Sequence, residues 1–361
     1  MSETLFSPEK IDEMPTIMDV VERISAIENK MALPFIDKIP LPEELDEGRY
    51  CFVSEQNNRA IAHLMPMSQS PFTFYRGQSK YYDSCLTSLY RKKDGNELLE
   101  EDIAYRRIKI CEFILTLGQH PVYGEVCQGV SWHPVALAQH YGLATEYLDI
   151  TNSKWVAAFF AATSYDEETD TYYPVGRDYG NGYGVMYISK DIMREGAIDD
   201  FFVKNGVIGY QYFDRPTKQS SFGFRMDKGE NFNKSPFFDK VFFRHDIEDS
   251  QMVFDMSYQQ RRFIPNDTLS KVARQIATSN NVTPKALMFC RQTYYPDKSP
   301  DFLERVCSLK GLKVLKDREY VVEYPQREIE EEWRVWNEFG RADLRSRILP
   351  IRPVSLFTFS E

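Results

Sequence analysis

Apolar residues recur along the chain at spacings that predict its main helices and strands. Intervals of three and four residues separate Ile17, Val20, Val21, Ile24 and Ile27. This spacing gives a helix one apolar face, so we predict an amphipathic helix over residues 17–30. Prolines follow at positions 34, 40 and 42 and interrupt the pattern. The first 45 residues are therefore predicted to form a helical arm that packs on the main domain or on a partner.

The remaining elements are predicted from short apolar runs, capping residues and turn residues. Further helices are expected over 97–117 with Asn96 as its cap, over 134–142, 155–164, 267–278 and 301–309, and from Glu328 through Trp333 and Trp336. Strands are expected over 72–76, 146–150 and 184–188, with a hairpin tip at 180–182 and a strand pair within 312–324. Thr151, Asn152 or Ser153 is the expected N-cap of the helix over 155–164.

This mixture predicts an α+β fold with a central mixed or antiparallel sheet split by helices. An N-terminal helical arm and a C-terminal strand and helix extension would flank the sheet. The predicted division is an arm over 1–45, a main domain over 46–290 and an extension over 291–361 that packs on the main domain.

Composition and charge narrow the class of protein. Of the 361 residues, 42% are hydrophobic and 14% aromatic, which supplies a substantial core. The first residues show no secretory signal and no apolar run is long enough to span a bilayer, so we expect a soluble, cytoplasmic chain without membrane partners. The six widely spaced cysteines suit reduced thiols. A net charge of −10 argues against bulk nucleic-acid binding but permits a local basic pocket.

Two short runs concentrate the candidate chemistry. Arg76 ends a predicted strand and precedes Gly77, so a planar fork of donors lies beside unobstructed backbone, which suits a phosphate or carboxylate. Arg76 could equally pair with a buried acid such as Asp149. His140 could be a general base or a structural hydrogen-bonding group near a helix C-terminus, where a cation is favoured. Asp149 could orient His140 or Arg76, or act as a cap. The five scattered histidines show no metal-ligand spacing, so no metal is expected.

These runs resemble the FRG domain family. The resemblance is carried by Phe74-Tyr75-Arg76-Gly77-Gln78, by Ser88-Leu89-Tyr90-Arg91, by Gln139 through Thr151 with the following Ala-Phe-Phe-Ala helix, and by Arg215 through Phe222. It extends over roughly residues 50 to 290. The resemblance to this family implies a toxin or phage-defence effector.

The order of these elements is also similar to ADP-ribosyltransferases. That resemblance implies that NAD is the cofactor, that Arg76 holds its phosphates and that Thr151 supports the nicotinamide pocket. Gln219 stands where those enzymes carry a glutamate, so Glu230 or Asp227 would have to supply the charge, or the domain binds without this chemistry. The predicted catalytic residues are His140, Asp149 and Gln219, and the predicted cofactor-binding residues are Tyr75, Arg76, Gly77, Tyr141 and Thr151.

Two other functions stay open from the sequence. In a noncatalytic recognition module the same residues would hold the fold together, and an acidic surface or the Trp333–Trp336 helix would bind a protein partner. Nucleic-acid cleavage by His140 and Asp149 lacks a supporting basic stripe. Convergence of the Arg76, His140 and Asp149 side chains on an open cleft would favour a ligand site.

Overall fold

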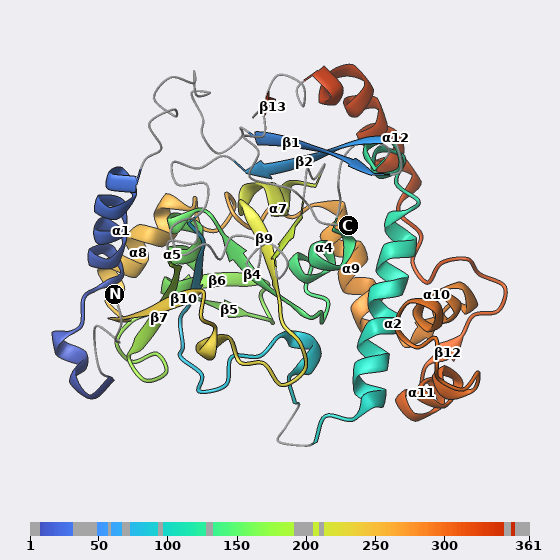
Figure 1. Cartoon of the computed structure of the whole chain (residues 1–361), viewed down its shortest axis with the longest axis horizontal. Coiled ribbons are helices and arrows are strands. Elements are labelled where there is room, and N and C mark those ends of the chain that lie inside the picture. The colour runs from blue at the N-terminus through green and yellow to red at the C-terminus, as the bar shows by residue number, and fades with distance from the viewer. Residues whose placement is uncertain are drawn as a thin grey trace.

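An antiparallel sheet of six strands forms the centre of the molecule (Figure 1). The computed structural model describes residues 8–31, 49–56, 59–66, 73–92, 97–127, 133–190, 205–208, 213–342 and 348–350. The order across the sheet is β10-β7-β3-β4-β9-β8, and each neighbouring pair is antiparallel. Its strands are β3 (Tyr75–Gln78), β4 (Tyr147–Thr151), β7 (Tyr183–Ser189), β8 (Asn205–Val207), β9 (Ser221–Arg225) and β10 (Phe238–Arg244).

Three smaller sheets surround the central one. They contain β1 (Arg49–Gln56) with β2 (Arg59–Pro66) and β13 (Ile348–Pro350), the hairpin of β5 (Thr163–Asp166) and β6 (Thr171–Pro174), and the parallel pair of β11 (Asn281–Val282) and β12 (Lys313–Val314).

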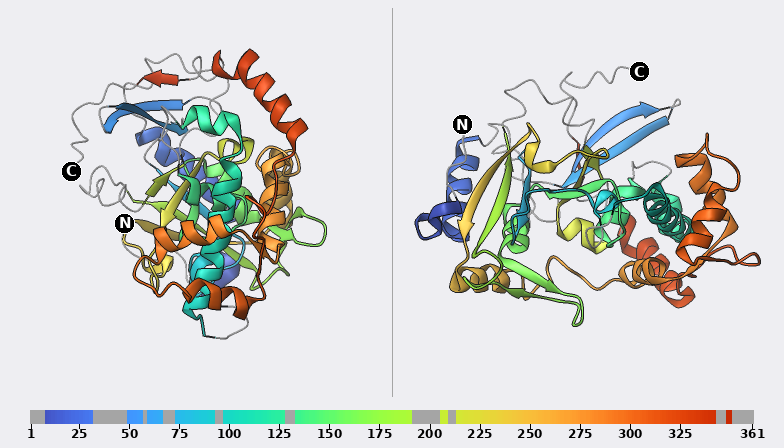
Figure 2. Two further views of the ribbon diagram at one scale, coloured as in Figure 1. Left: turned by 90° about the vertical axis from the view of Figure 1, so that its right-hand side faces the viewer. Right: turned by 90° about the horizontal axis from the view of Figure 1, so that it is seen from below.

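The helices lie mainly at two ends of the molecule. The described ones are η1 (Pro8–Glu13), α1 (Ile17–Met31), η4 (Ser88–Tyr90), α2 (Glu100–Leu117), α3 (Pro121–Val126), α4 (Pro134–His140), α5 (Lys154–Ala162), α7 (Asp214–Lys218), η5 (Phe232–Lys234), α8 (Ile247–Met256), α9 (Thr268–Thr278), α10 (Pro284–Tyr294), α11 (Phe302–Lys310), α12 (Gln326–Val335) and η6 (Trp336–Gly340). Helix α1 stands at one end, and α2 with α10 and α11 at the other (Figure 1, Figure 2). No helix in the described ranges combines the length and apolarity needed to cross a membrane.

Alternation along the strands divides the core between the two faces of the sheet. Phe74 and Tyr187 pack on one face with phenylalanines of β9 and β10. Tyr75 and Met186, their neighbours in sequence, point to the other face, where helices α1, α5 and α8 cover them. Helix α5 has apolar residues on most sides because it lies between the sheet and helices α1 and α8.

The structure confirms the α+β class and most predicted helices. Helices α1, α4, α9 and α11 begin and end within two residues of their predicted bounds, and Gly142 and Gly311 have positive φ at the ends of α4 and α11. Ser153 caps α5, since its hydroxyl accepts from the backbone N–H of Val156. The predicted domain boundaries stay predictions.

Three predicted elements differ. Strand β3 begins at Tyr75 and runs past Arg76, because Gly77 and Gln78 continue the ladder with β7. Helix α2 begins at Glu100, and the expected cap Asn96 lies outside the described residues. The strand pair predicted within 312–324 is wrong: only Lys313 and Val314 form a strand, and their partner is β11. The apolar residues Val322 and Tyr324 pack instead against a helical core cluster.

Candidate functional site

Strands β3 and β4 separate next to the predicted site residues. Their pairing joins Tyr75 to Thr151, whereas Arg76, Gly77 and Gln78 pair with β7 on the other side. The Arg76 guanidinium reaches across, and its Nη1 donates to the backbone carbonyl of Asp149 at 2.6 Å. A pocket of about 580 Å³ opens here, lined by β3, β4, α5 and the β5–β6 hairpin. Its volume is in the range of small-molecule sites.

His140 and Asp149 meet at this pocket. His140 comes from the last turn of α4, and its side chain is 2% exposed, whereas the Asp149 side chain is 38% exposed. His140 Nε2 lies 3.3 Å from Asp149 Oδ1, within ion-pair distance. Neither atom has a partner in hydrogen-bond geometry, and the buried Arg76 Nε also has none. Buried polar atoms without a hydrogen bond are uncommon in folded proteins, and three of them lie at this pocket.

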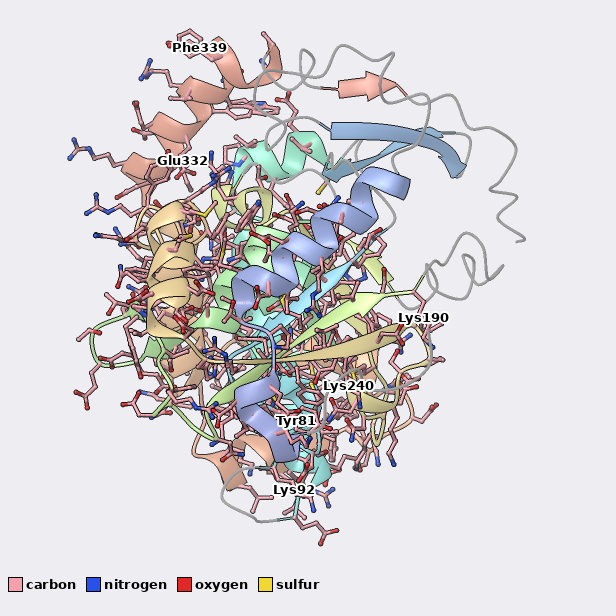
Figure 3. All side chains as sticks on the ribbon, turned by 90° about the vertical axis from the view of Figure 1, so that its left-hand side faces the viewer. Tyr81, Lys92, Lys190, Lys240, Glu332 and Phe339 are labelled. Atoms are coloured by element: carbon pink, nitrogen blue, oxygen red, sulfur yellow. The ribbon has the colours of Figure 1, made fainter. Side chains whose placement is uncertain are left out.

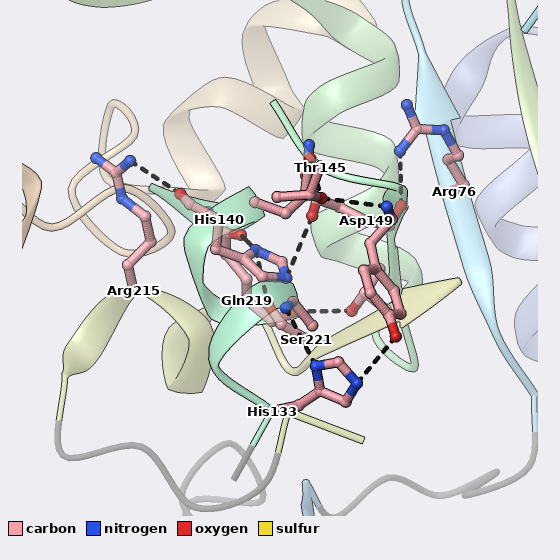
Figure 4. Close-up of polar contacts among 12 residues, drawn as sticks. Arg76, His133, His140, Thr145, Asp149, Arg215, Gln219 and Ser221 are labelled. Atoms are coloured by element: carbon pink, nitrogen blue, oxygen red, sulfur yellow. Dashed lines mark hydrogen bonds and ion pairs between the residues drawn. The ribbon is translucent and has the colours of Figure 1, made fainter. Parts of the chain in front are cut away.

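The other ring nitrogen of His140 faces β9 and the turn before it. Nδ1 lies 3.1 Å from Gln219 Oε1 and 3.4 Å from Ser221 Oγ. The backbone carbonyl of His140 accepts from Arg215 Nη1 at 3.2 Å. Figure 4 shows these contacts, which fix the orientation of the imidazole.

The charge of the pocket is opposite in sign to that of the chain. Among the described residues that line it, the cationic side chains are Arg76, Lys80 and Arg91, and the carboxylate is Asp149. Burial, and then the nearby Arg76 guanidinium, lower the pKa of Arg91. Two guanidinium groups that repel each other in partly dry surroundings favour an anion between them.

Aromatic rings form much of the remaining wall. Tyr82 is 51% exposed and lies below the Lys80 ammonium, which is 5.8 Å from the ring centroid. Tyr165, 41% exposed, and the more buried Phe160 and Tyr172 line the pocket from α5 and the hairpin. Burial raises the pKa of Tyr172 to about 12, so its phenol stays neutral. These faces are suited to a planar aromatic group.

Seven of the eight predicted site residues line the pocket, all except Tyr141. Two of the seven, Gln219 and Thr151, also make hydrogen bonds that hold the fold. The Gln219 amide is engaged on both sides, by His140 and by the Phe263 carbonyl at 3.0 Å. The Thr151 hydroxyl donates to the Gln219 carbonyl at 2.7 Å and accepts from the Ser153 N–H, so it holds the turn before α5.

The other three predicted cofactor contacts are engaged in structural hydrogen bonds or close packing. The Tyr75 hydroxyl points to α1 and donates to Glu28 at 2.6 Å, and burial raises its pKa. The Tyr141 hydroxyl donates to Asp267 at 2.6 Å, and Tyr141 is absent from the pocket lining. A Cβ on Gly77 would lie 1.8 Å from the Ala157 carbonyl oxygen, so this glycine permits close packing of α5 on β3.

Lys80, Arg91 and Tyr82 line the pocket but were not among the predicted site residues. Arg91 stands in the Ser88–Arg91 motif, which was the available signal, but nothing local showed that it faces Arg76. The loop that carries Tyr82 is held by Asn233, whose side chain donates to the Tyr82 carbonyl at 2.7 Å. That partner lies 151 residues away in sequence, beyond the reach of a local pattern.

Neither alternative acid for the transferase chemistry lies at the pocket. Glu230 accepts from the backbone N–H of Asp227 at 2.7 Å, and Asp227 lies 3.4 Å from Arg225 in an exposed pair. Neither residue lines the pocket. In the described part of the chain, no group of three His, Cys, Asp or Glu side chains is arranged to hold a metal ion.

The helix proposed for partner binding is less available than its sequence predicts. Trp336 is 2% exposed, although the neighbouring Phe339 is 65% exposed at the outer end of the helix (Figure 3).

The convergence of Arg76, His140 and Asp149 on an open pocket favours a ligand site over scaffolding.

Comparison with known proteins agrees with the motifs. The FRG domain model matches residues 72–170, a narrower range than the predicted 50 to 290. The chain contains an FRG domain. The matched segment contains Arg76, His140 and Asp149. Gln219 and Ser221 also line the pocket, although they lie outside the matched segment. No curated protein and no solved structure matches the chain significantly.

Proposed function

We propose that the FRG domain binds a phosphate-bearing nucleotide, of which NAD is the best candidate. The observation that carries the proposal is the group of three cations, Arg76, Lys80 and Arg91, around a pocket of about 580 Å³ in a chain of net charge −10. Guanidinium groups bind phosphate oxygens in pairs of parallel hydrogen bonds. The exposed faces of Tyr82 and Tyr165 can stack on a base.

Transfer of ADP-ribose from NAD is the reaction that these groups best support. The bond between nicotinamide and the ribose C1 would break, with its electron pair leaving on nicotinamide, while an acceptor oxygen or nitrogen bonds to C1. Asp149, the carboxylate among the described lining residues, would stabilise the cationic sugar, a role that Gln219 cannot fill. His140 would take the proton that the acceptor loses. An effector role in toxicity or phage defence follows from the family resemblance and belongs to this proposal.

Isothermal titration with NAD and ADP-ribose tests the binding. Arg76→Ala removes a charge-assisted hydrogen bond to phosphate, so the affinity should fall by about 10- to 100-fold. Arg225→Ala is the matched control, because Arg225 is on β9, half-exposed and outside the pocket lining. Circular dichroism verifies that both variants are folded.

Two results would separate the parts of the proposal. Equal affinity in the Arg76→Ala variant, or no binding by the wild type, would refute nucleotide binding and leave the noncatalytic recognition module as the alternative. Binding without release of nicotinamide, in the presence of candidate acceptor proteins, would refute the transfer reaction alone.

A further inference from the structure

The buried amide of Gln219 decides which nitrogen of His140 carries a proton. Gln219 Nε2 donates to the Phe263 carbonyl at 3.0 Å. A carbonyl oxygen only accepts, so the amide nitrogen must face Phe263 and the amide oxygen must face His140. Because Gln219 Oε1 lies 3.1 Å from His140 Nδ1 and also only accepts, Nδ1 must carry the hydrogen.

The second contact of Nδ1 fits the same assignment. Ser221 Oγ lies 3.4 Å from Nδ1 and can accept from it or turn its own hydrogen elsewhere. His140 therefore presents Nε2 to the pocket whether the ring is neutral or protonated. The partner of an imidazole's second nitrogen commonly sets its tautomer in this way.

His140 Nε2 and Asp149 Oδ1 lie 3.3 Å apart, within ion-pair distance. Both atoms are buried, and neither makes a hydrogen bond with the described residues (Figure 4). Two arginines contact the backbone of these residues: Arg215 of α7 donates to the His140 carbonyl, and Arg76 of β3 donates to the Asp149 carbonyl.

A hydroxyl group suits this pair better than any other ligand group. It can donate to the Asp149 carboxylate and at the same time accept from a protonated Nε2, or it can donate to a neutral Nε2. A second carboxylate or phosphate placed here would meet the charge of Asp149 at close range. The adjoining Arg76 and Arg91 supply the place for the phosphate.

We infer that the pocket selects a sugar phosphate, with a sugar hydroxyl on His140 Nε2 and Asp149 Oδ1 beside a phosphate on Arg76. This inference rests on the proposed nucleotide binding and adds the group that the pocket distinguishes. Gln219 is a positioning residue: it holds the proton on Nδ1 and leaves Nε2 for the hydroxyl.

The binding test compares nicotinamide mononucleotide with its 2′,3′-dideoxy analogue by isothermal titration, because this ribose is the one that the proposed function places at Asp149. We expect the dideoxy compound to bind about tenfold more weakly to the wild type, since a buried polar pair then lacks its partner. Gln219→Met keeps the length of the side chain but neither hydrogen bond, so the two compounds should bind it with similar affinity. Equal affinity for the wild type, with binding still dependent on Arg76, overturns this inference alone. No binding of either compound overturns the proposed function as well.

A spectroscopic test leaves Gln219 in place. Long-range ¹H–¹⁵N spectra of the histidine-labelled wild-type protein report which ring nitrogens are protonated, and His140→Asn identifies the His140 signals. We expect a protonated Nδ1. A neutral ring with its proton on Nε2 overturns the inference, because Gln219 would then not set the tautomer.

Discussion

Gly77→Ala tests whether this glycine serves packing or ligand access. The added Cβ would lie 1.8 Å from the Ala157 carbonyl oxygen and 2.9 Å from the Ala161 Cβ. Ordinary contacts begin near 3.4 Å, so β3 and α5 would have to separate by more than 1 Å. Both neighbours belong to a buried helix. Strain of this kind costs about 3 kcal/mol, at the upper end of typical overpacking.

The assay is thermal and urea unfolding without ligand, beside Gly124→Ala as the matched control. With an unfolding entropy of about 2.1 cal/mol/K per residue, 3 kcal/mol lowers the Tm of a 361-residue two-state unit by about 4 °C. Gly124 is exposed within α3, and a Cβ there meets no atom within 4 Å. Gly124→Ala should therefore be neutral or stabilise by up to about 1 kcal/mol. A Gly77→Ala variant as stable as the wild type would refute the packing argument.

Three further expectations concern stability, pH and salt. Tyr141→Phe should lower the free energy of unfolding by about 1 kcal/mol through loss of the bond to Asp267, and titration should show unchanged nucleotide affinity. Burial raises the pKa of Glu112, so its carboxyl holds a proton more tightly in the folded state than in the unfolded state. This proton binding stabilises the fold at low pH, and the stabilisation is lost as the pH rises from the pKa of the unfolded state through the raised pKa of the folded state. In urea unfolding, the free energy of unfolding of Glu112→Gln should therefore rise relative to that of the wild type as the pH increases above about 4.5. A difference between the two proteins that does not change with pH would contradict this prediction. Nucleotide affinity should fall between low and high salt because cations form the pocket, and salt-independent affinity would count against phosphate binding.

The amino-acid sequence alone was sufficient for the elements that local rules control. Apolar spacing predicted α1 and α9, and the Pro134 and Gly142 pair predicted α4, because each depends on residues within a few turns of the chain. The motifs also predicted one site for Arg76, His140 and Asp149, and the structure places all three in the lining of one pocket.

Tertiary structure alone decided what surrounds those three residues. Lys80 and Arg91 join Arg76 through loops whose positions are set by partners distant in sequence, such as Asn233. Tyr75 and Tyr141 lie within the motifs, yet their hydroxyls are engaged by Glu28 and Asp267. A motif records which residues are near in sequence, whereas the direction of a side chain depends on strand alternation and on which helices cover each face.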